Sequence, residues 1–165
     1  MTVSPQLISG GELFHRPAAT GPAFWGPGDH YTFLVTGEES GGAYFAMEAL
    51  VPPGGGPPPH LHTREEETFY VLEGQLEFLL GEDIRIAGPG DFVNVPRGVV
   101  HRFLSIGTET ARVVITFTPA GIDQWFLQTL DAAPNGVTAA DVPDNVEEVA
   151  ARYAATAADY GIEFV

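Results

Sequence analysis

The 165-residue chain contains neither cysteine nor lysine. Without cysteine there are no disulfides, no thiolate metal ligands and no cysteine nucleophile. Without lysine, a Schiff base with a carbonyl substrate is excluded, and so is the lysine of a phosphate-binding loop. Catalysis or binding by this chain therefore has to use other side chains.

Positive charge and long apolar runs are also scarce. Seven arginines face 22 acidic residues, and the formal net charge is −15. A phosphate backbone needs a basic footprint, so no nucleic-acid partner is expected, and the acidic surface is interpreted as a solubility feature. No apolar run approaches the roughly 20 residues of a membrane-spanning helix, and the first residues do not resemble a signal peptide. No membrane partner is expected, and the expected location is cytoplasmic.

Glycine and proline are abundant, with 20 and 14 residues, and they predict many turns. Between them lie short stretches rich in aromatic and β-branched residues, several of which alternate in polarity as half-buried strands do. The expected strands are residues 30–36, 43–51, 68–73, 75–80, 83–87, 91–95, 100–106 and 111–118. This spacing predicts an all-β antiparallel sandwich or barrel. The chain is expected to be one domain, residues 1–165, with its core at about 30–118.

After Pro119 the sequence changes character and predicts a short helical tail, over about residues 121–161. Residues 121–130 are expected to form a short helix that carries Trp125 and Phe126. Residues 144–161 have a stronger helical pattern, in which Asp144 and Glu147 match a capping box and Gly161 suits the C-terminal cap.

Two histidines in "GGGPPPHLHTREEETFYVLEG", residues 54–74, suggest half of a metal site. His60 and His62 are two positions apart, so in an extended segment they point to the same face with Cα atoms about 6.6 Å apart. Two imidazoles at that spacing can converge on one ion, and a carboxylate would complete a mixed ligand set. Spacing alone does not choose among Glu65, Glu66 and Glu67. The alternative is a solvated turn with incidental ion pairs.

A second segment supplies a third histidine. "GDFVNVPRGVVHRFLS", residues 90–105, predicts a strand, a Pro-x-Gly turn and a strand that begins at His101. Such a turn sends the chain back antiparallel and can return His101 to the first pair. His15 and His30 have no such neighbours in the sequence and are interpreted as ordinary surface or strand residues.

These two segments resemble the two motifs of the cupin superfamily. The first consists of Gly54, five residues, His60-x-His62, four residues, Glu67, six residues and Gly74. The second consists of Gly90, five residues, Pro96-x-Gly98, two residues and His101. Of the three glutamates, only Glu67 has the distance to Gly74 that the pattern requires. Ser105 departs from the pattern, which usually has asparagine there, at a structural corner and not at a ligand.

The resemblance implies a cupin β jelly-roll barrel with one divalent metal ion inside it, of which Fe, Mn, Ni, Co and Zn are the alternatives. The implied ligands are His60, His62, Glu67 and His101, and Glu67 is also the implied catalytic base. The resemblance further implies a homodimer.

The segments "PPGGGPPPHLHTREEETFYVLEG", "TPAGIDQWFLQTL" and "YGIEF" resemble the quercetinase-like branch of single-domain bacterial cupins. This implies an oxidoreductase, a metal-dependent dioxygenase that uses O₂ on a small aromatic or enolic substrate, flavonol- or polyketide-like. Two alternatives stay open. One is a non-oxidative metal-dependent cyclase, isomerase or lyase, and the other is a small-molecule-binding cupin without catalysis.

Strand alternation predicts an apolar pocket around the metal. Phe69, Val71 and Phe103 share the facing of Glu67 and His101, and Phe45 and Met47 are expected to face the same way. Trp125 and Phe126 are expected either to close this pocket or to anchor the tail in the core. Such a lining suits an aromatic substrate better than a sugar.

Overall fold

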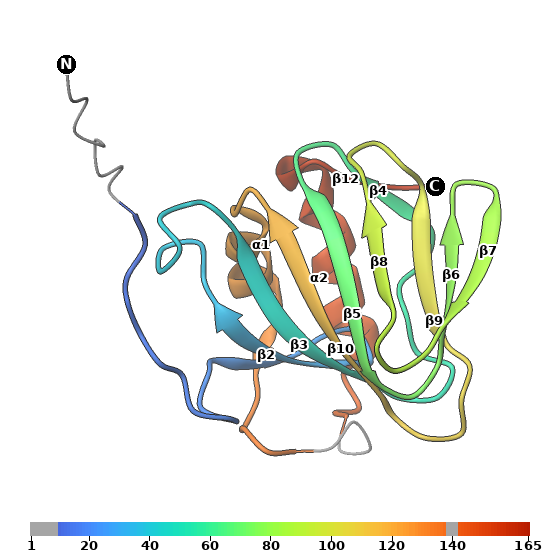
Figure 1. The fold of residues 1–165 in the computed structure, drawn as a ribbon, viewed down its shortest axis with the longest axis horizontal. Helices are drawn as coiled ribbons and strands as arrows, with labels where there is room; N and C mark the ends of the chain where they lie inside the picture. Colours follow the sequence, from blue (N-terminus) through green and yellow to red (C-terminus); the bar gives the residue numbers. More distant parts are fainter. Residues whose placement is uncertain (1–9, 138–141) are drawn as a thin grey trace.

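The computed structural model describes residues 10–137 and 142–165, and most of these lie in two antiparallel β-sheets (Figure 1). The seven-stranded sheet consists, in spatial order, of β11 (Asp131–Ala132), β1 (Ala23–Trp25), β2 (His30–Val35), β3 (Phe45–Val51), β10 (Ala111–Thr118), β5 (Glu66–Glu73) and β8 (Phe92–Val95). The five-stranded sheet consists of β12 (Ile162–Phe164), β4 (His60–His62), β9 (His101–Ser105), β6 (Leu76–Leu80) and β7 (Asp83–Ala87). Within the described ranges no ladder joins the sheets, so the fold is jelly-roll-like without being one closed, hydrogen-bonded barrel.

All eight predicted strands are present, and each boundary lies within two residues of the prediction. The all-β, jelly-roll prediction is therefore confirmed. The strands without a prediction are β1, β4, β11 and β12, which are two or three residues long. Segments this short carry no measurable alternation, and they become strands by pairing with neighbours from elsewhere in the chain.

The sheets pack face to face through side chains that alternate along each strand. In β10, Val113, Ile115 and Phe117 are at most 2% exposed while the residues between them are half-buried. Phe69 of β5 packs across the interface, with its ring 5.0 Å from Phe78 of the opposite sheet. The core therefore lies between the sheets, as period-two alternation requires.

Two helices complete this core. α1 (Ile122–Thr129) buries Phe126 with its ring 5.8 Å from Tyr31 of β2 and 5.7 Å from Phe45 of β3. α2 (Val146–Thr156) packs against α1, where the rings of Trp125 and Tyr153 are 3.6 Å apart. Of the helices that the structure describes, none is long and apolar enough to cross a membrane.

The C-terminal tail differs from its prediction at both ends. The capping box is wrong, because α2 begins after Asn145, whose side chain donates instead to Asp131 Oδ2 at 2.8 Å. The 3₁₀ helix η2 (Ala157–Tyr160) continues α2 and ends, as predicted, at Gly161, which has a φ of 78°. A Cβ on Gly161 would lie 2.5 Å from Thr63 Oγ1. The chain then forms β12 and joins the five-stranded sheet, so the tail is not purely helical.

Candidate metal centre

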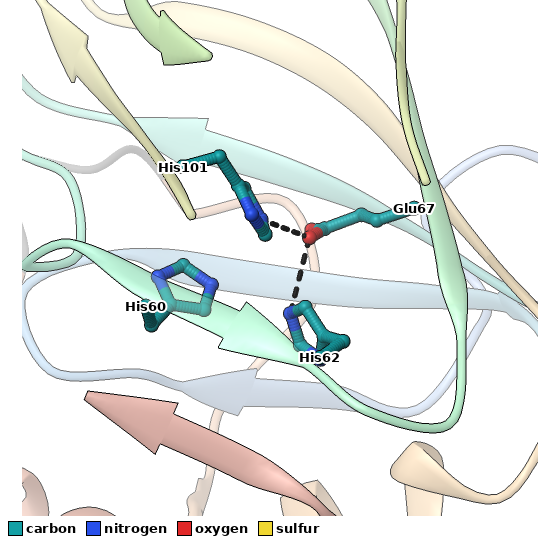
Figure 2. Close-up of side chains that lie close together, drawn as sticks. All are labelled: His60, His62, Glu67 and His101. Atoms are coloured by element: carbon teal, nitrogen blue, oxygen red, sulfur yellow. Dashed lines mark hydrogen bonds and ion pairs between the residues drawn. The ribbon is translucent and has the colours of Figure 1, made fainter. Parts of the chain in front are cut away.

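Three histidines from one sheet meet a glutamate from the other (Figure 2). His60 and His62 lie on β4, and His101 lies on the adjacent β9 as the register partner of His60. Glu67 lies on β5 of the seven-stranded sheet. The four side chains therefore meet in the interior between the sheets.

The Pro96–Gly98 turn positions His101 differently from the prediction. β8 and β9 belong to different sheets, so the turn carries the chain from one sheet to the other and does not form a hairpin. His101 reaches His60 through the β4–β9 ladder. The backbone N–H of Gly98 donates to the carbonyl of His62 at 2.8 Å, which fastens the turn to the strand of the first two histidines.

The four side chains are close together and buried. One candidate ligand atom from each of the four residues lies within 4.8 Å of the others, and each residue is at most 7% exposed. Glu67 Oε2 is 2.7 Å from His101 Nε2, with which it forms a hydrogen bond. The same oxygen is 3.1 Å from His62 Nε2, without hydrogen-bond geometry.

Backbone carbonyls orient two of the imidazoles. His60 Nδ1 is 2.9 Å from the carbonyl oxygen of Pro58, and His101 Nδ1 is 2.9 Å from that of Val99. A carbonyl only accepts, so Nδ1 carries the proton in both rings, and Nε2 of the neutral ring has a free lone pair. Metal-ligating histidines characteristically donate their other N–H in this way.

The three neighbouring glutamates have different surroundings. Glu66 is exposed, whereas Glu65 is buried beside His62. Its Oε2 lies 3.8 Å from His62 Nδ1 and has no hydrogen-bond partner among the residues that the structure describes. That distance is too long for a hydrogen bond. Only Glu67 reaches the three imidazoles.

Burial and mutual charge shift the pKa values of the cluster. Burial lowers the pKa of His60 to about 4, against the opposing charge of Glu67. Burial alone would raise the pKa of Glu67, but the charge of His62 and the hydrogen bond from His101 hold it well below its usual value. Burial opposes protonation of His101, but its hydrogen bond to Glu67 raises its pKa above the usual value. The cluster thus favours the ionised form of the buried Glu67 carboxyl group and makes the His101 imidazole more basic.

This arrangement fits a divalent cation. Both ring nitrogens of His101 face oxygen acceptors. Only a doubly protonated, positively charged ring can donate to both of them. The position between His101 Nε2 and Glu67 therefore favours positive charge. Three imidazoles and one carboxylate are a donor set that suits Fe, Mn, Co, Ni and Zn, and four ligands leave positions open for a substrate. His60, His62, Glu67 and His101 can therefore hold such an ion.

An apolar pocket of about 40 Å³ adjoins the cluster. Of the residues expected there, Met47, Phe103, Trp125 and Phe126 line it. Phe45, Phe69 and Val71 do not line it and belong instead to the core between the sheets. The prediction did not include seven further lining residues, Tyr31, Pro57, Ile115, Phe117, Tyr153, Ile162 and Phe164.

These seven residues differ in whether the sequence could have indicated them. Ile115 and Phe117 carry the alternation of a predicted strand, whereas Phe164 belongs to a strand that only its pairing with β4 creates. The ring of Phe164 lies 6.0 Å from that of His60.

The remaining two histidines lie outside the cluster. His15 is exposed. His30 is a strand residue, as predicted, but it is 2% exposed and its Nε2 donates to the carbonyl of Pro134 at 3.2 Å. Its partner is 104 positions away in the chain, so no neighbouring residue indicated it.

Ser105 is held by its backbone. Its carbonyl accepts from the N–H of Gly54 at 2.8 Å, and its N–H donates to the carbonyl of Gly55 at 2.9 Å. The corner thus forms without a side-chain hydrogen bond, since Ser105 Oγ has no partner in the described part of the chain.

The chain resembles several known proteins. A family model for the cupin domain matches residues 47–117, from β3 to β10. Quercetin 2,3-dioxygenase of Bacillus subtilis (strain 168) is 30% identical over 105 residues, which cover 62% of this chain and 30% of that protein. The polyketide synthase CurC of Streptomyces cyaneus is 32% identical over 92 residues, which cover 56% of this chain and 60% of that protein. The chain thus spans less than a third of the dioxygenase and about three fifths of CurC.

A solved structure has a similar fold. The polyketide cyclase RemF from Streptomyces resistomycificus aligns with a TM-score of 0.56 and 23% identity, over 82% of this chain and 94% of RemF. At this identity the likeness concerns the fold alone.

Proposed function

The chain belongs to the cupin superfamily, and we propose that it is a metal-dependent dioxygenase acting on a small aromatic or enolic substrate. The observation that carries the proposal is a buried cluster of three histidines and one glutamate beside a pocket walled by aromatic side chains. Similarity to quercetin 2,3-dioxygenase supports a flavonol-like substrate.

The residues around the cluster have separate roles in this proposal. A divalent cation bound there supplies a Lewis acid for a hydroxyl oxygen of the substrate. Glu67, the carboxylate of the cluster, takes the proton of that hydroxyl. Phe117 and Phe164, whose rings lie 5.7 Å from His62 and 6.0 Å from His60, exclude water from the ring that becomes electron-rich. That ring is the reductant for O₂, and both oxygen atoms enter the ring-opened product, so no external reductant is needed.

The first alternative is a non-oxidative, metal-dependent cyclase, isomerase or lyase. Similarity to the polyketide synthase CurC favours it, because the same cluster can polarise a polyketide carbonyl without O₂. The two reactions share the metal and the pocket and differ in whether oxygen is consumed.

The test combines metal analysis with oxygen uptake. The purified protein is stripped with a chelator, reloaded separately with each of the five metals, and incubated with quercetin, other flavonols and enolic polyketides. We expect metal-dependent O₂ uptake, and product that contains both atoms of ¹⁸O₂. Product formed equally well without O₂ would establish the non-oxidative alternative, and binding without any product would establish a small-molecule-binding protein.

A further inference from the structure

The pocket beside the metal cluster is too small for an aromatic substrate by itself. Its volume is about 40 Å³, whereas pockets for small organic ligands measure about 300–1,000 Å³. A second cavity of about 240 Å³ adjoins it, and the two share Tyr31, Pro57, Tyr153 and Phe164 as walls. A substrate of the proposed class that reaches the cluster therefore has to extend into this second chamber.

The second chamber has an apolar lining with one acidic exception. Pro57, Pro58, Ala150 and Phe164 form much of its wall, and Asp29, in the turn between β1 and β2, is its only charged residue in the described part of the chain. Asp29 is 4% exposed, far below what is usual for a carboxylate. A carboxyl group buried in an apolar wall is unfavourable unless a hydrogen-bonding group or a cation pairs with it.

Asp29 is only half satisfied by the protein. Its Oδ2 accepts a hydrogen bond from the hydroxyl of Tyr31 at 3.2 Å. Its Oδ1 is buried and has no hydrogen-bond partner among the described residues. Burial raises the pKa of Asp29 to about 7, although the bond from Tyr31 opposes this. Because the Tyr31 proton points to Asp29, the Tyr31 oxygen also keeps an acceptor position free.

The glycine–proline segment before His60 builds the chamber next to this pair. A Cβ on Gly55 would lie 2.9 Å from the carbonyl oxygen of Pro52 and 3.2 Å from Asp29 Oδ1. Gly56 has a φ of 143°, and a Cβ there would lie 2.0 Å from the carbonyl oxygen of Phe103. The glycines thus let the chain pass close to β9 and Asp29, and the prolines that follow form a rigid wall.

We propose that Asp29 and Tyr31 form a specificity site that binds a phenolic hydroxyl at the end of the substrate remote from the metal cluster. The inference rests on the proposed function, because it concerns the same aromatic substrate. Tyr31 lines both cavities, so a ring that passes from one to the other meets its hydroxyl. The unpaired Asp29 Oδ1 and the free acceptor position of Tyr31 both suit an O–H donor, and neither gains from a C–H.

Two flavonols test this site. Quercetin and 3-hydroxyflavone share the enolic hydroxyl, and only quercetin carries further ring hydroxyls. Binding to the metal-loaded protein is measured without O₂, so that no turnover occurs. We expect the wild type to bind quercetin about 3- to 10-fold more tightly, as one net hydrogen bond provides.

Tyr31→Phe and Asp29→Asn are expected to abolish this preference while leaving the affinity for 3-hydroxyflavone unchanged. Tyr31→Phe removes one oxygen, and Asp29→Asn keeps the shape but removes the charge and one acceptor. Tyr70→Phe is the matched control, because Tyr70 is 44% exposed and outside both cavities. Circular dichroism and metal content show which variants are folded. One folded variant of the two is enough for the comparison.

The outcomes separate this inference from the proposed function. A preference for quercetin that survives in a folded variant overturns the inference, as does an equal loss of affinity for both ligands. Failure of the wild type to distinguish the two flavonols also overturns it. Each of these results is compatible with normal O₂ uptake. Absence of O₂ uptake across the whole substrate panel instead overturns the proposed function.

Discussion

At the scale of single residues, hydrogen bonds that Nδ1 donates to backbone carbonyls prepare His60 and His101 to bind a cation through Nε2. His62 has no such bond within the described part of the chain, and buried Glu65 is 3.8 Å from its Nδ1. Two of the three imidazoles are therefore oriented by backbone that does not depend on side-chain identity. The identity of the histidines themselves remains decisive for the cluster.

Replacing a cluster histidine by alanine is expected to reduce metal binding sharply. Loss of an outer-shell partner already weakens metal affinity by about 10- to 100-fold, and loss of a ligand should exceed that. His60→Ala, His62→Ala and His101→Ala are compared with the wild type by metal analysis after dialysis. His15→Ala and His30→Ala are the controls and should retain metal. Full occupancy in His101→Ala would contradict the four-residue site.

Glu67→Gln separates a ligand from a catalytic base. The substitution keeps the shape and an oxygen donor but removes the charge and the basicity. Occupancy should fall less than in the histidine variants, because three imidazoles remain. Turnover per bound metal should fall by about a hundred-fold or more, as is typical when a general base is lost. Equal turnover per metal in the two proteins would leave Glu67 as a ligand only.

At the scale of elements, the three-residue strand β4 carries two of the histidines and depends on its neighbours. It lies between β9 and the C-terminal strand β12, in which Ile162 pairs with His62 and Phe164 pairs with His60. Ile162 is 2% exposed. An element this short has little stability of its own, so its position depends on both ladders.

Removing residues 162–165 should therefore affect both stability and metal binding. Loss of buried Ile162 alone is expected to lower the free energy of unfolding by about 2–5 kcal/mol. Without β12, His60 and His62 lose a hydrogen-bonded neighbour, and metal affinity should weaken as well. Urea unfolding and metal titration measure the two effects. Glu163→Ala, at an exposed position on β12, is the control and should preserve both. A shortened protein with unchanged metal affinity would show that β9 alone positions β4.

At the scale of the whole molecule, buried titratable groups between the sheets give opposite contributions to stability. Burial lowers the pKa of His60 from 6.5 to about 4. In the metal-free protein the contribution of His60 to the free energy of unfolding is therefore lost as the pH falls through that range. The depressed pKa of Glu67 acts in the same direction at lower pH. Asp29 has the opposite sign, because its pKa rises from 3.8 to about 7. The contribution of Asp29 to the free energy of unfolding is complete below pH 3.8 and is lost as the pH rises through about 7.

Asp29→Asn should therefore change the pH dependence of unfolding. Between pH 5 and pH 8 the wild type should lose free energy of unfolding relative to the variant, on the order of 2 kcal/mol. Urea denaturation of both metal-free proteins at the two pH values measures this difference. Any pH-independent cost of the new amide cancels in the comparison. A constant difference between the proteins would mean that Asp29 titrates normally and is not buried as described.

Much of this protein follows from local sequence pattern. Stretches rich in aromatic and β-branched residues between turn residues located all eight longer strands, and several of these strands alternate at period two. The spacing of the histidines placed His60 and His62 on one face, and the resemblance to the cupin motif, which requires a fixed distance from the glutamate to Gly74, selected Glu67. These features depend on residues close together in the chain, and the geometry of an extended strand is the same in any fold.

The tertiary structure alone decided the rest. β12 is a strand only because β4 lies beside it, and His30 has a partner only because Pro134 returns to β2. The pairing of Asp29 with Tyr31, and the division between Phe103 at the pocket and Phe69 in the core, depend on how the sheets and helices meet. Alternation predicts which side chains face inward, but not how deeply they are buried or which residues they contact. Those properties arise from contacts between residues distant in the sequence, whose positions no local pattern contains.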